Sequence, residues 1–529
     1  MLIKIIFLIA FFAVMIGVGI YCRKQATDVN GFVLGSRNVG PWLTAFAFGT
    51  SYFSAVIFVG YAGQFGWKYG MAATWIGIGN ALIGSLLAWK LLGRRTRVMT
   101  QHLSSATMPD FFGKRFDSNA LKIAAAVIIF VFLIPYTASL YNGLSRLFEM
   151  AFHIDYTYCV IGMAVLTGIY VVVGGYMATA INDFIQGIIM LFGIVAVIVA
   201  IMLSKGGISE AVAELSHQSV QTAAGTTFNG AFTSFFGPDF FGLFGVVILT
   251  SLGTWGLPQM VQKFYAIKSE KSISTGTIVS TAFAVIVAGG CYFLGGFGRI
   301  FTTQEAVDKN GFDSIIPSML ENLSPVLIGI VVILVLSASM STLSSLVLTS
   351  GATLTLDFIN PIFKGKSEAG TMTEKSKMRC MRILIVFFIA VSALLAIIQA
   401  KSSVTFIAQL MGISWGALAG AFLAPFLYGL YMKKTSKAAV WVSFILGAGI
   451  MIADMACNFT GNVFISPYFT SPINAGVLAM LANLVLVPII SLVFPNKNQE
   501  SVNNIFSCFD RKVTVSSKHA IGDEETSNN

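Results

Sequence analysis

The chain has 529 residues, of which 56% are hydrophobic and only 11% charged, and its mean hydropathy is +0.81. This balance excludes a soluble globular protein and predicts an all-α polytopic membrane protein embedded in a lipid bilayer. In a soluble protein the formal net charge of +10 would suggest a nucleic-acid partner. Here the basic residues lie in short loops between apolar runs, where they act as topology signals, so we expect no nucleic-acid partner.

Thirteen apolar runs are long enough to span a membrane as helices, which takes about 20 residues each. They lie at 2–21, 41–64, 71–93, 120–147, 155–178, 184–204, 238–261, 273–298, 324–356, 380–399, 404–431, 438–457 and 471–494. The first run is followed by Cys22-Arg23-Lys24 rather than by a small-residue cleavage site. We therefore expect a retained helix and not a signal peptide.

Lysine and arginine gather in alternate connections between these runs. The basic residues that share one side when thirteen helices alternate are Arg23, Lys24, Arg37, Arg94, Arg95, Arg97, Lys114, Arg115, Lys263, Lys268, Lys271, Lys364, Lys366, Lys375, Lys377, Arg379, Arg382, Lys433, Lys434, Lys437 and those of the tail. The opposing connections 205–237, 299–323 and 458–470 carry very few. The positive-inside rule then predicts a multi-pass protein of the plasma (cell) membrane with its N-terminus outside and its C-terminus cytoplasmic.

Two of the outer connections are long enough for local structure. Ile208 to Ser216 reads as a short amphipathic helix, and Gln304 to Leu320 is expected to contain another. After Pro495 the sequence turns polar, and we expect a disordered cytoplasmic tail over 496–529.

A stripe of hydroxyl groups lies inside the apolar run 328–356. Ser341, Ser344 and Ser345 share one helical face, and Thr342 stands beside them. Small hydroxyl residues of this kind let membrane helices pack closely and bond to their own carbonyls one turn back. They are also the hard oxygen donors that a small cation such as sodium prefers. The stripe is therefore a candidate ion site.

Two predicted helices contain residues that interrupt a helix in mid-membrane. The segment 48–55 holds a glycine and three hydroxyl residues, and the segment 253–258 holds two glycines and a proline. Either could be a simple kink. However, the two helices lie five spans apart, as the first helices of two five-helix repeats would, and five is odd, so such repeats insert with opposite topology. Paired interruptions of this kind point to the substrate site of a transporter.

Four stretches carry a family resemblance by their order and spacing. They are Gly35-Ser36-Arg37-Asn38-Val39-Gly40-Pro41, the run Met108 to Phe116, the run Gly174 to Ala178 with Asn182 to Gly187, and Met340 to Ser344. From about Asp28 to Leu430 the chain resembles the sodium:solute symporters, most nearly the bacterial sodium/proline members. The resemblance implies the leucine-transporter fold, a 5+5 inverted repeat. The implied organisation is 1–40 as an extra helix and loop, 41–432 as the ten-helix core, 433–495 as two further helices, and 496–529 as the tail.

The resemblance also implies the ion ligands. The expected cofactor is Na+, which the hydroxyl-rich site favours, and proton coupling is the alternative in this family. The principal sodium site would use backbone carbonyls of Thr50, Phe53 and Ala338 with the hydroxyls of Ser341 and Thr342. A second sodium site would share Ser341 and add Asp183, Ser344 and Ser345. The alternative for Asp183 is a structural role, either as an interfacial residue or as an amino-terminal cap of the sixth span.

The candidate solute residues lie at the two interruptions: Tyr52, Ser54, Ala55, Thr254, Trp255 and Pro258. The sodium/proline members have an aspartate where this chain has Tyr52, and their tryptophan and tyrosine that help enclose proline align with Thr250 and Thr254. Aromatic residues such as Phe53, Trp75, Tyr136 and Tyr141 could line the same pocket or belong to the core and the interfacial belt.

The resulting hypothesis is a sodium-coupled symporter that imports a small organic solute by alternating access. An amino acid such as proline ranks first, and an organic acid, sugar acid or vitamin-like solute is the alternative. A transporter-like solute sensor is disfavoured because the tail lacks the periodicity of an output domain. An enzyme is not expected, because four scattered histidines and no paired intramembrane acids leave little chemistry. A channel is harder to exclude from the sequence.

Overall fold

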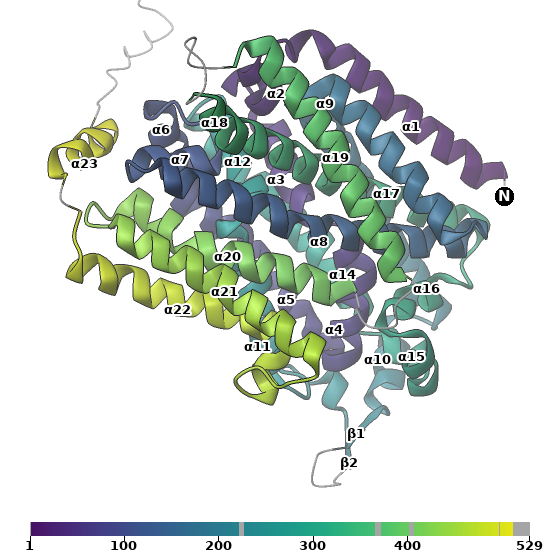
Figure 1. Cartoon of the computed structure of the whole chain (residues 1–529). Helices are drawn as coiled ribbons and strands as arrows, with labels where there is room; N and C mark the ends of the chain where they lie inside the picture. Colours follow the sequence, from purple (N-terminus) through teal and green to yellow (C-terminus); the bar gives the residue numbers. More distant parts are fainter. Residues whose placement is uncertain (1, 222–226, 365–371, 401–406, 497, 511–529) are drawn as a thin grey trace, which may run out of the picture.

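The computed structural model describes residues 2–221, 227–364, 372–400, 407–496 and 498–510. Within these ranges the chain is nearly all helical, and its two described strands form one antiparallel hairpin, β1 Ser219–Gln221 with β2 Thr227–Asn229. Figure 1 shows a bundle of long helices with this hairpin projecting from one end. The predicted all-α fold class is confirmed.

The membrane helices follow one another along the whole chain. In order they are α1 Leu2–Cys22; α3 Pro41–Tyr52 with Val56–Tyr61 and α4 Ala62–Tyr69; α5 Thr74–Gly79 continuing through Asn80–Leu87 and Trp89–Gly93 into α6 Arg94–His102; α8 Asn119–Phe152; α9 Tyr156–Ser204; α11 Phe240–Leu252 with Gly253–Gly256 and α12 Pro258–Ala266; α13 Lys271–Ala284 with Val285–Gly289 and α14 Gly290–Gly295; α17 Pro325–Thr353 with Leu354–Ile359 and α18 Asn360–Lys364; α19 Glu374–Ala400; α20 Ile407–Tyr431; α21 Lys437–Thr460; and α22 Pro472–Val493.

The number of membrane crossings is about thirteen. In the described ranges, ten helical stretches are long and apolar enough to span, and eleven when the bent pair of α11 and α12 is counted as one span. Two stretches are too long for a single crossing: Tyr156–Ser204 has 49 residues and Val56–His102 has 47, which at 1.5 Å per residue is about 70 Å against a hydrocarbon core of about 30 Å. Each is broken at a glycine with positive φ, Gly175 (59°) and Gly70 (62°).

Both predicted interruptions are real breaks in the helix. The helix α3 ends at Tyr52, and Phe53 is extended (φ −93°, ψ 117°) before the chain turns helical again. In the second case Leu257 is extended (φ −83°, ψ 121°) between Gly253–Gly256 and α12, and the two helical halves are bent by 46°. Pro258 is the first residue of α12, where its missing N–H costs no hydrogen bond. The kink alternative is therefore wrong for both segments.

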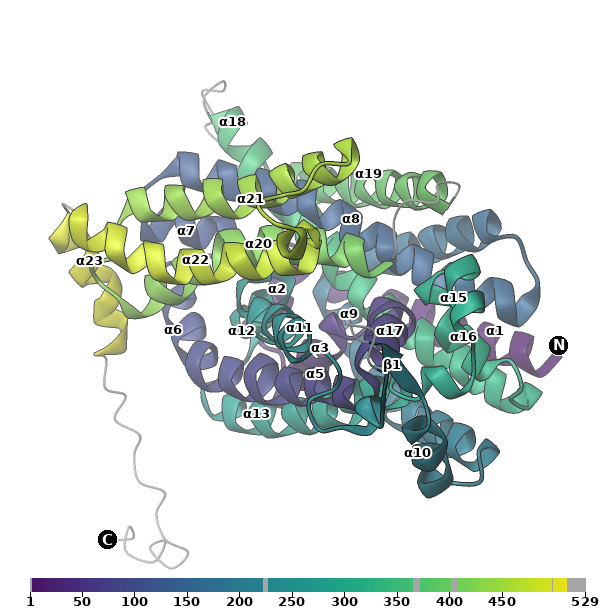
Figure 2. The same ribbon diagram turned by 90° about the horizontal axis from the view of Figure 1, so that it is seen from below.

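The two broken helices meet at one end of the bundle. The Val39 amide donates to the Ala266 carbonyl (3.2 Å), and the Lys268 amide donates to the Val39 carbonyl (3.0 Å). These bonds join the entry to α3 to the exit from α12. The helix α12 and most of α3 lie in the interior of the bundle (Figures 1 and 2).

The helix α17 lies at the centre of the fold, packed against α9, α8, α19, α1 and α3. All of its residues from Val331 to Thr353 are buried apart from Ile333. At the edges of the bundle, α1 packs on α9 and α17, and α21 and α22 pack on α20 (Figure 1). The hydroxyl stripe of α17 consequently faces protein on every side.

The short helices on the hairpin side agree with expectation. The helix α10 spans Ile208–Ser216, as predicted, and the segment 304–320 holds α15 Gln304–Asn310 and α16 Ile315–Leu320. On the opposite end lie α2 Val29–Leu34, α7 Met108–Arg115 and α23 Gln499–Phe506 (Figure 1).

The beginning of the tail differs from the prediction of disorder over 496–529. Residues Gln499–Phe506 form α23, followed by the single turn Ser507–Phe509. The Phe506 ring lies 5.0 Å from the Arg115 guanidinium, and Phe509 lies 4.6 Å from that of Arg95. Burial lowers the pKa of Arg115 to about 10, so this cation stays charged at neutral pH. Aromatic residues in a polar tail thus anchor it on α6 and α7; residues 511–529 lie outside the described ranges.

Candidate functional site

The five predicted sodium ligands come together between α17 and the break after α3. The Ser341 hydroxyl lies 3.1 Å from the Thr50 carbonyl oxygen and 3.0 Å from that of Ala338. The Thr342 hydroxyl lies 3.2 Å from the Thr50 carbonyl, 3.3 Å from that of Phe53 and 3.2 Å from that of Ala338. Three carbonyl oxygens and two hydroxyl oxygens thus converge in a fully buried place, which we call the α3–α17 oxygen cluster.

The break in α3 makes this cluster possible. In an unbroken helix the carbonyls of Thr50 and Phe53 would accept bonds from amides four residues later. Because Phe53 is extended, the Thr50 carbonyl instead meets both hydroxyls of α17. A hydroxyl that donates to such a carbonyl can rotate and turn a lone pair toward the same point. The cluster offers hard oxygen ligands of the kind that small hard cations bind.

A close approach of helices holds α3 in place. A Cβ atom on Gly187 of α9 would lie 2.3 Å from the Phe46 ring and 3.1 Å from a methyl group of Thr50. Only a glycine at this position lets α9 pack so closely against the last turns of α3. The position of the Thr50 carbonyl therefore depends on α9.

The other predicted ligands surround a lysine. The Lys263 ammonium of α12 donates to the Ser345 hydroxyl (3.0 Å) and pairs with the Asp183 carboxylate (3.5 Å). The Ser345 hydroxyl also shares a hydrogen bond with Ser51 (3.0 Å), whereas the Ser344 hydroxyl donates to the Ser341 carbonyl (2.9 Å). Asp183 lies in the middle of a helical stretch of α9, two turns after the break at Gly175, so the alternative of an amino-terminal cap is wrong.

The prediction that Lys263 lies in a basic loop is wrong. Lys263 was counted among the basic loop residues because an apolar run ends at 261. In the structure α12 continues to Ala266, and the Lys263 side chain is only 3% exposed. No local signal marks Lys263 as buried, because its partner Asp183 lies on a different helix.

The candidate solute residues fall into two groups. Ser54 and Ala55 follow the break in α3, where the Ala55 amide donates to the Ser339 hydroxyl of α17 (3.3 Å). Thr254 and Trp255 instead face the α5–α6 helix: Thr254 donates to the Gly84 carbonyl (3.2 Å), and the Trp255 indole donates to that of Ile83 (3.0 Å).

The two remaining solute candidates are Pro258 and Tyr52. Pro258 borders a very small gap of about 10 Å³ together with Gln262 and Thr349. The backbone of Tyr52 closes α3, while its side chain lies outside the described part of the chain.

An aromatic residue of α8 borders the break in α3, and a second one, from α20, packs against it. Tyr136 of α8 lies next to Ser54 and packs edge-on against Trp415 of α20, with ring centroids 6.0 Å apart. Gly143 of α8 lets the backbone of Ala55 approach, since a Cβ there would lie 3.1 Å from that of Ala55. Tyr136 was one of the aromatic candidates in the sequence; Trp415 was not.

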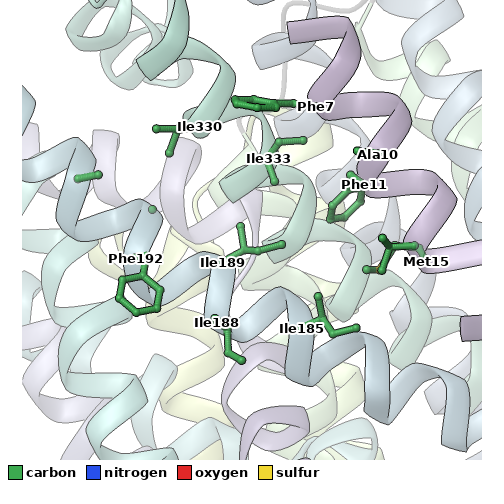
Figure 3. Close-up of a pocket in the computed structure, with 13 residues that line it drawn as sticks. Phe7, Ala10, Phe11, Met15, Ile185, Ile188, Ile189, Phe192, Ile330 and Ile333 are labelled. Atoms are coloured by element: carbon green, nitrogen blue, oxygen red, sulfur yellow. The ribbon is translucent and has the colours of Figure 1, made fainter. Parts of the chain in front are cut away.

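A large apolar cavity of about 550 Å³ lies away from these groups. It is lined by side chains of α1, α9 and α17, among them Phe11, Ile189 and Ile333. Figure 3 shows these side chains pointing into the space between the three helices. Its walls supply no hydroxyl or carboxylate ligands, so it is not a site for an ion.

Fold and geometry together define a class of protein: a multi-pass secondary transporter with the leucine-transporter fold. One broken helix, α3, meets the central polar helix α17 at a buried cluster of oxygens, and the second contacts α17 through Lys263 and Ser345. Paired broken helices of this kind are the architecture of such carriers. In agreement, the structure superposes on that of a Na+-coupled sialic acid symporter in a substrate-bound outward-open state. The TM-score is 0.75 at 18% sequence identity, covering 94% of this chain and 98% of the other.

The family follows from sequence comparison. The model of the sodium:solute symporter family matches residues 32–447. Sodium/proline symporter 2 of Staphylococcus saprophyticus is 30% identical over 454 residues, covering 84% of this chain and 85% of that protein. The sodium/proline symporter of Staphylococcus aureus is 31% identical over 459 residues, covering 85% of each. This chain belongs to the sodium:solute symporter family, and it is a transporter rather than an enzyme.

Proposed function

We propose that this chain imports a small organic solute, an amino acid such as proline, together with Na+ bound at the α3–α17 oxygen cluster. The observation that carries the proposal is the convergence of the Ser341 and Thr342 hydroxyls on the Thr50 and Phe53 carbonyls. These ligands belong to two different helices. A sodium ion among them favours the arrangement in which α3 and α17 are held together.

The break in α3 also supports the position of the solute. Ser54 and Ala55 follow directly after Phe53, a ligand of the cluster; Tyr136 lies beside Ser54, and Trp415 packs against Tyr136. On this proposal one unwound segment serves ion and solute, so that filling the ion site shapes the solute site. Two aromatic rings with one hydroxyl and one indole N–H suit a small solute with an apolar body and polar ends.

The names of the relatives support an amino acid as solute, since two of them are sodium/proline symporters. An organic acid, sugar acid or vitamin-like solute is the alternative, because Tyr52, Thr250 and Thr254 replace residues tied to proline in the family. The pattern of basic loops supports an N-terminus outside the cell membrane and a cytoplasmic C-terminus. With that orientation, sodium and solute move inward together.

Sodium entry supplies enough free energy for concentrative uptake. One charge crossing about 100 mV gives roughly 2.3 kcal/mol, and a tenfold sodium gradient gives about 1.4 kcal/mol more. The sum corresponds to a solute gradient of a few hundredfold for each sodium ion.

The experiment is uptake of a panel of labelled solutes into proteoliposomes, each with and without an inward sodium gradient. The panel holds proline, other small amino acids, carboxylates, sugar acids and vitamin-like compounds. We expect one class to accumulate above equilibrium only with the gradient. Equilibration without accumulation would indicate a channel, and uptake indifferent to sodium would refute the proposed coupling.

A further inference from the structure

A buried ammonium group lies where the family resemblance implies a second sodium ion. Lys263 is 3% exposed and its partner Asp183 is fully buried. The ammonium contacts the Asp183 carboxylate, the Ser345 hydroxyl and, at 5.2 Å, the face of the Tyr176 ring. These groups come from α9, α17 and α12, and Ser51 of α3 adjoins them through Ser345.

The ligands of this lysine are those that a sodium ion would use. An ammonium group carries the same unit charge as Na+ and takes oxygen atoms as partners. Asp183 supplies the carboxylate, and Ser345 supplies a hydroxyl oxygen. A sodium ion in the same place would stand within a few ångströms of the ammonium, and two like charges at such a distance repel strongly in a buried site.

We propose that the Lys263 ammonium is a built-in cation that takes the place of a second sodium ion, so that this carrier couples a single sodium to each solute. The inference rests on the proposed function, because it takes the α3–α17 oxygen cluster as the one working sodium site. It predicts that removing the lysine side chain while keeping Asp183 opens a second sodium site.

The test counts sodium ions bound to purified protein, with no solute present. Radioactive sodium bound at saturation gives the number directly, and the shift of Tm with sodium concentration gives it independently through linkage. We expect one sodium for the wild type and two for Lys263→Ala. The double variant Lys263→Ala/Asp183→Asn should return to one, because it lacks the carboxylate of the second site.

Two variants serve as controls. Lys263→Arg keeps a cation in the cluster and should bind one sodium. Lys205→Ala removes a lysine from a partly exposed pair, with Glu214 at 3.0 Å, and should also bind one. A second sodium in either variant would contradict the inference, since neither frees the buried carboxylate of Asp183.

Failure of the inference and failure of the proposed function give different results. Two sodium ions in the wild type, or one in a folded Lys263→Ala protein, overturn the inference alone. A wild type that binds none, or unchanged binding in Ser341→Ala/Thr342→Ala, contradicts the proposed function. If Lys263→Ala does not fold, the ratio of sodium to solute taken up by the wild type tests the inference instead. One sodium ion per solute molecule supports the inference, and two sodium ions per solute molecule overturn it.

Discussion

Ser341 and Thr342 contact different numbers of carbonyl oxygens at the proposed ion site. Thr342 reaches three carbonyls, including that of Phe53, whereas Ser341 reaches two. A hydrogen bond or ligand contact to a charged group is worth about 1.5–3 kcal/mol, which is roughly 10- to 150-fold in affinity. We predict that Ser341→Ala and Thr342→Ala each raise the half-saturating sodium concentration by about tenfold or more.

The matched control for these variants is Ser350→Ala. Ser350 is another buried serine of α17, two to three turns beyond the cluster. Sodium-dependent uptake should keep its half-saturating concentration in this variant. An equal loss in Ser350→Ala would show that α17 tolerates no hydroxyl removal and would remove the support for specific ligands.

Tyr136 tests the proposed solute pocket separately from the ion site. Its hydroxyl lies next to Ser54, after the break in α3. We predict that Tyr136→Phe raises the half-saturating solute concentration by about tenfold, the cost of one lost hydrogen bond in a buried site. Sodium binding measured without solute should not change. A change in sodium binding with unaltered solute affinity would place Tyr136 with the ion instead.

The hydroxyl stripe could be predicted from the sequence because helical spacing alone puts Ser341, Ser344 and Ser345 on one face. The role of Lys263 could not, because a lysine just after an apolar run is more often a loop residue than a buried one. Lys263 is buried together with a tertiary partner, Asp183, which lies 80 positions earlier in the chain. Nothing in the sequence shows that the helix of Asp183 packs next to α12. Pairing of this kind follows from packing and not from local pattern.

At the scale of single elements, the contact between α9 and α3 governs the site. A Cβ on Gly187 would meet the Phe46 ring at 2.3 Å, so a larger residue must push α3 away. Overpacking of this kind costs about 1–3 kcal/mol. We predict that Gly187→Ala lowers both Tm and sodium affinity, since Thr50 shifts with α3.

The control for this variant is Gly162→Ala in the same helix. No atom lies within 4 Å of the added methyl group there. Both Tm and sodium affinity should match the wild type. If Gly187→Ala lowers Tm but leaves the sodium affinity unchanged, the packing of α9 on α3 does not control the ion site, and the prediction is contradicted.

The broken helices were predictable because glycine and proline act locally, and their separation by five spans is visible in the sequence. The aromatic surroundings of the solute segment were harder. Trp415 meets Tyr136 only because α20 packs on α8, a contact between residues 279 positions apart. The helix α23 in the tail could not be predicted for the same reason. Its packing depends on contacts of Phe506 with Arg115 of α7 and of Phe509 with Arg95 of α6, which are distant in the sequence.

In the whole molecule the two broken helices are tied to each other. The Val39 bridge joins the entry of α3 to the exit of α12, and the Arg37 guanidinium adds a bond to the Tyr265 carbonyl (3.1 Å). The helix α17 contacts both members of this pair. It contacts α3 through the oxygen cluster and α12 through the hydrogen bond between Lys263 and Ser345. On our account, sodium strengthens the first of these contacts and the lysine supplies the second. For transport by alternating access, we expect the tied pair to move relative to α17.

The most direct test compares sodium-driven solute uptake by the wild type and by Ser341→Ala/Thr342→Ala in proteoliposomes, with the Tm of each protein measured without sodium as a check on folding. The account predicts that the wild type accumulates solute in proportion to the sodium gradient. The double variant should still be folded but should no longer concentrate solute at any sodium gradient that drives the wild type. Accumulation by the double variant with unchanged sodium dependence would contradict the claim that these two hydroxyls hold the driving ion.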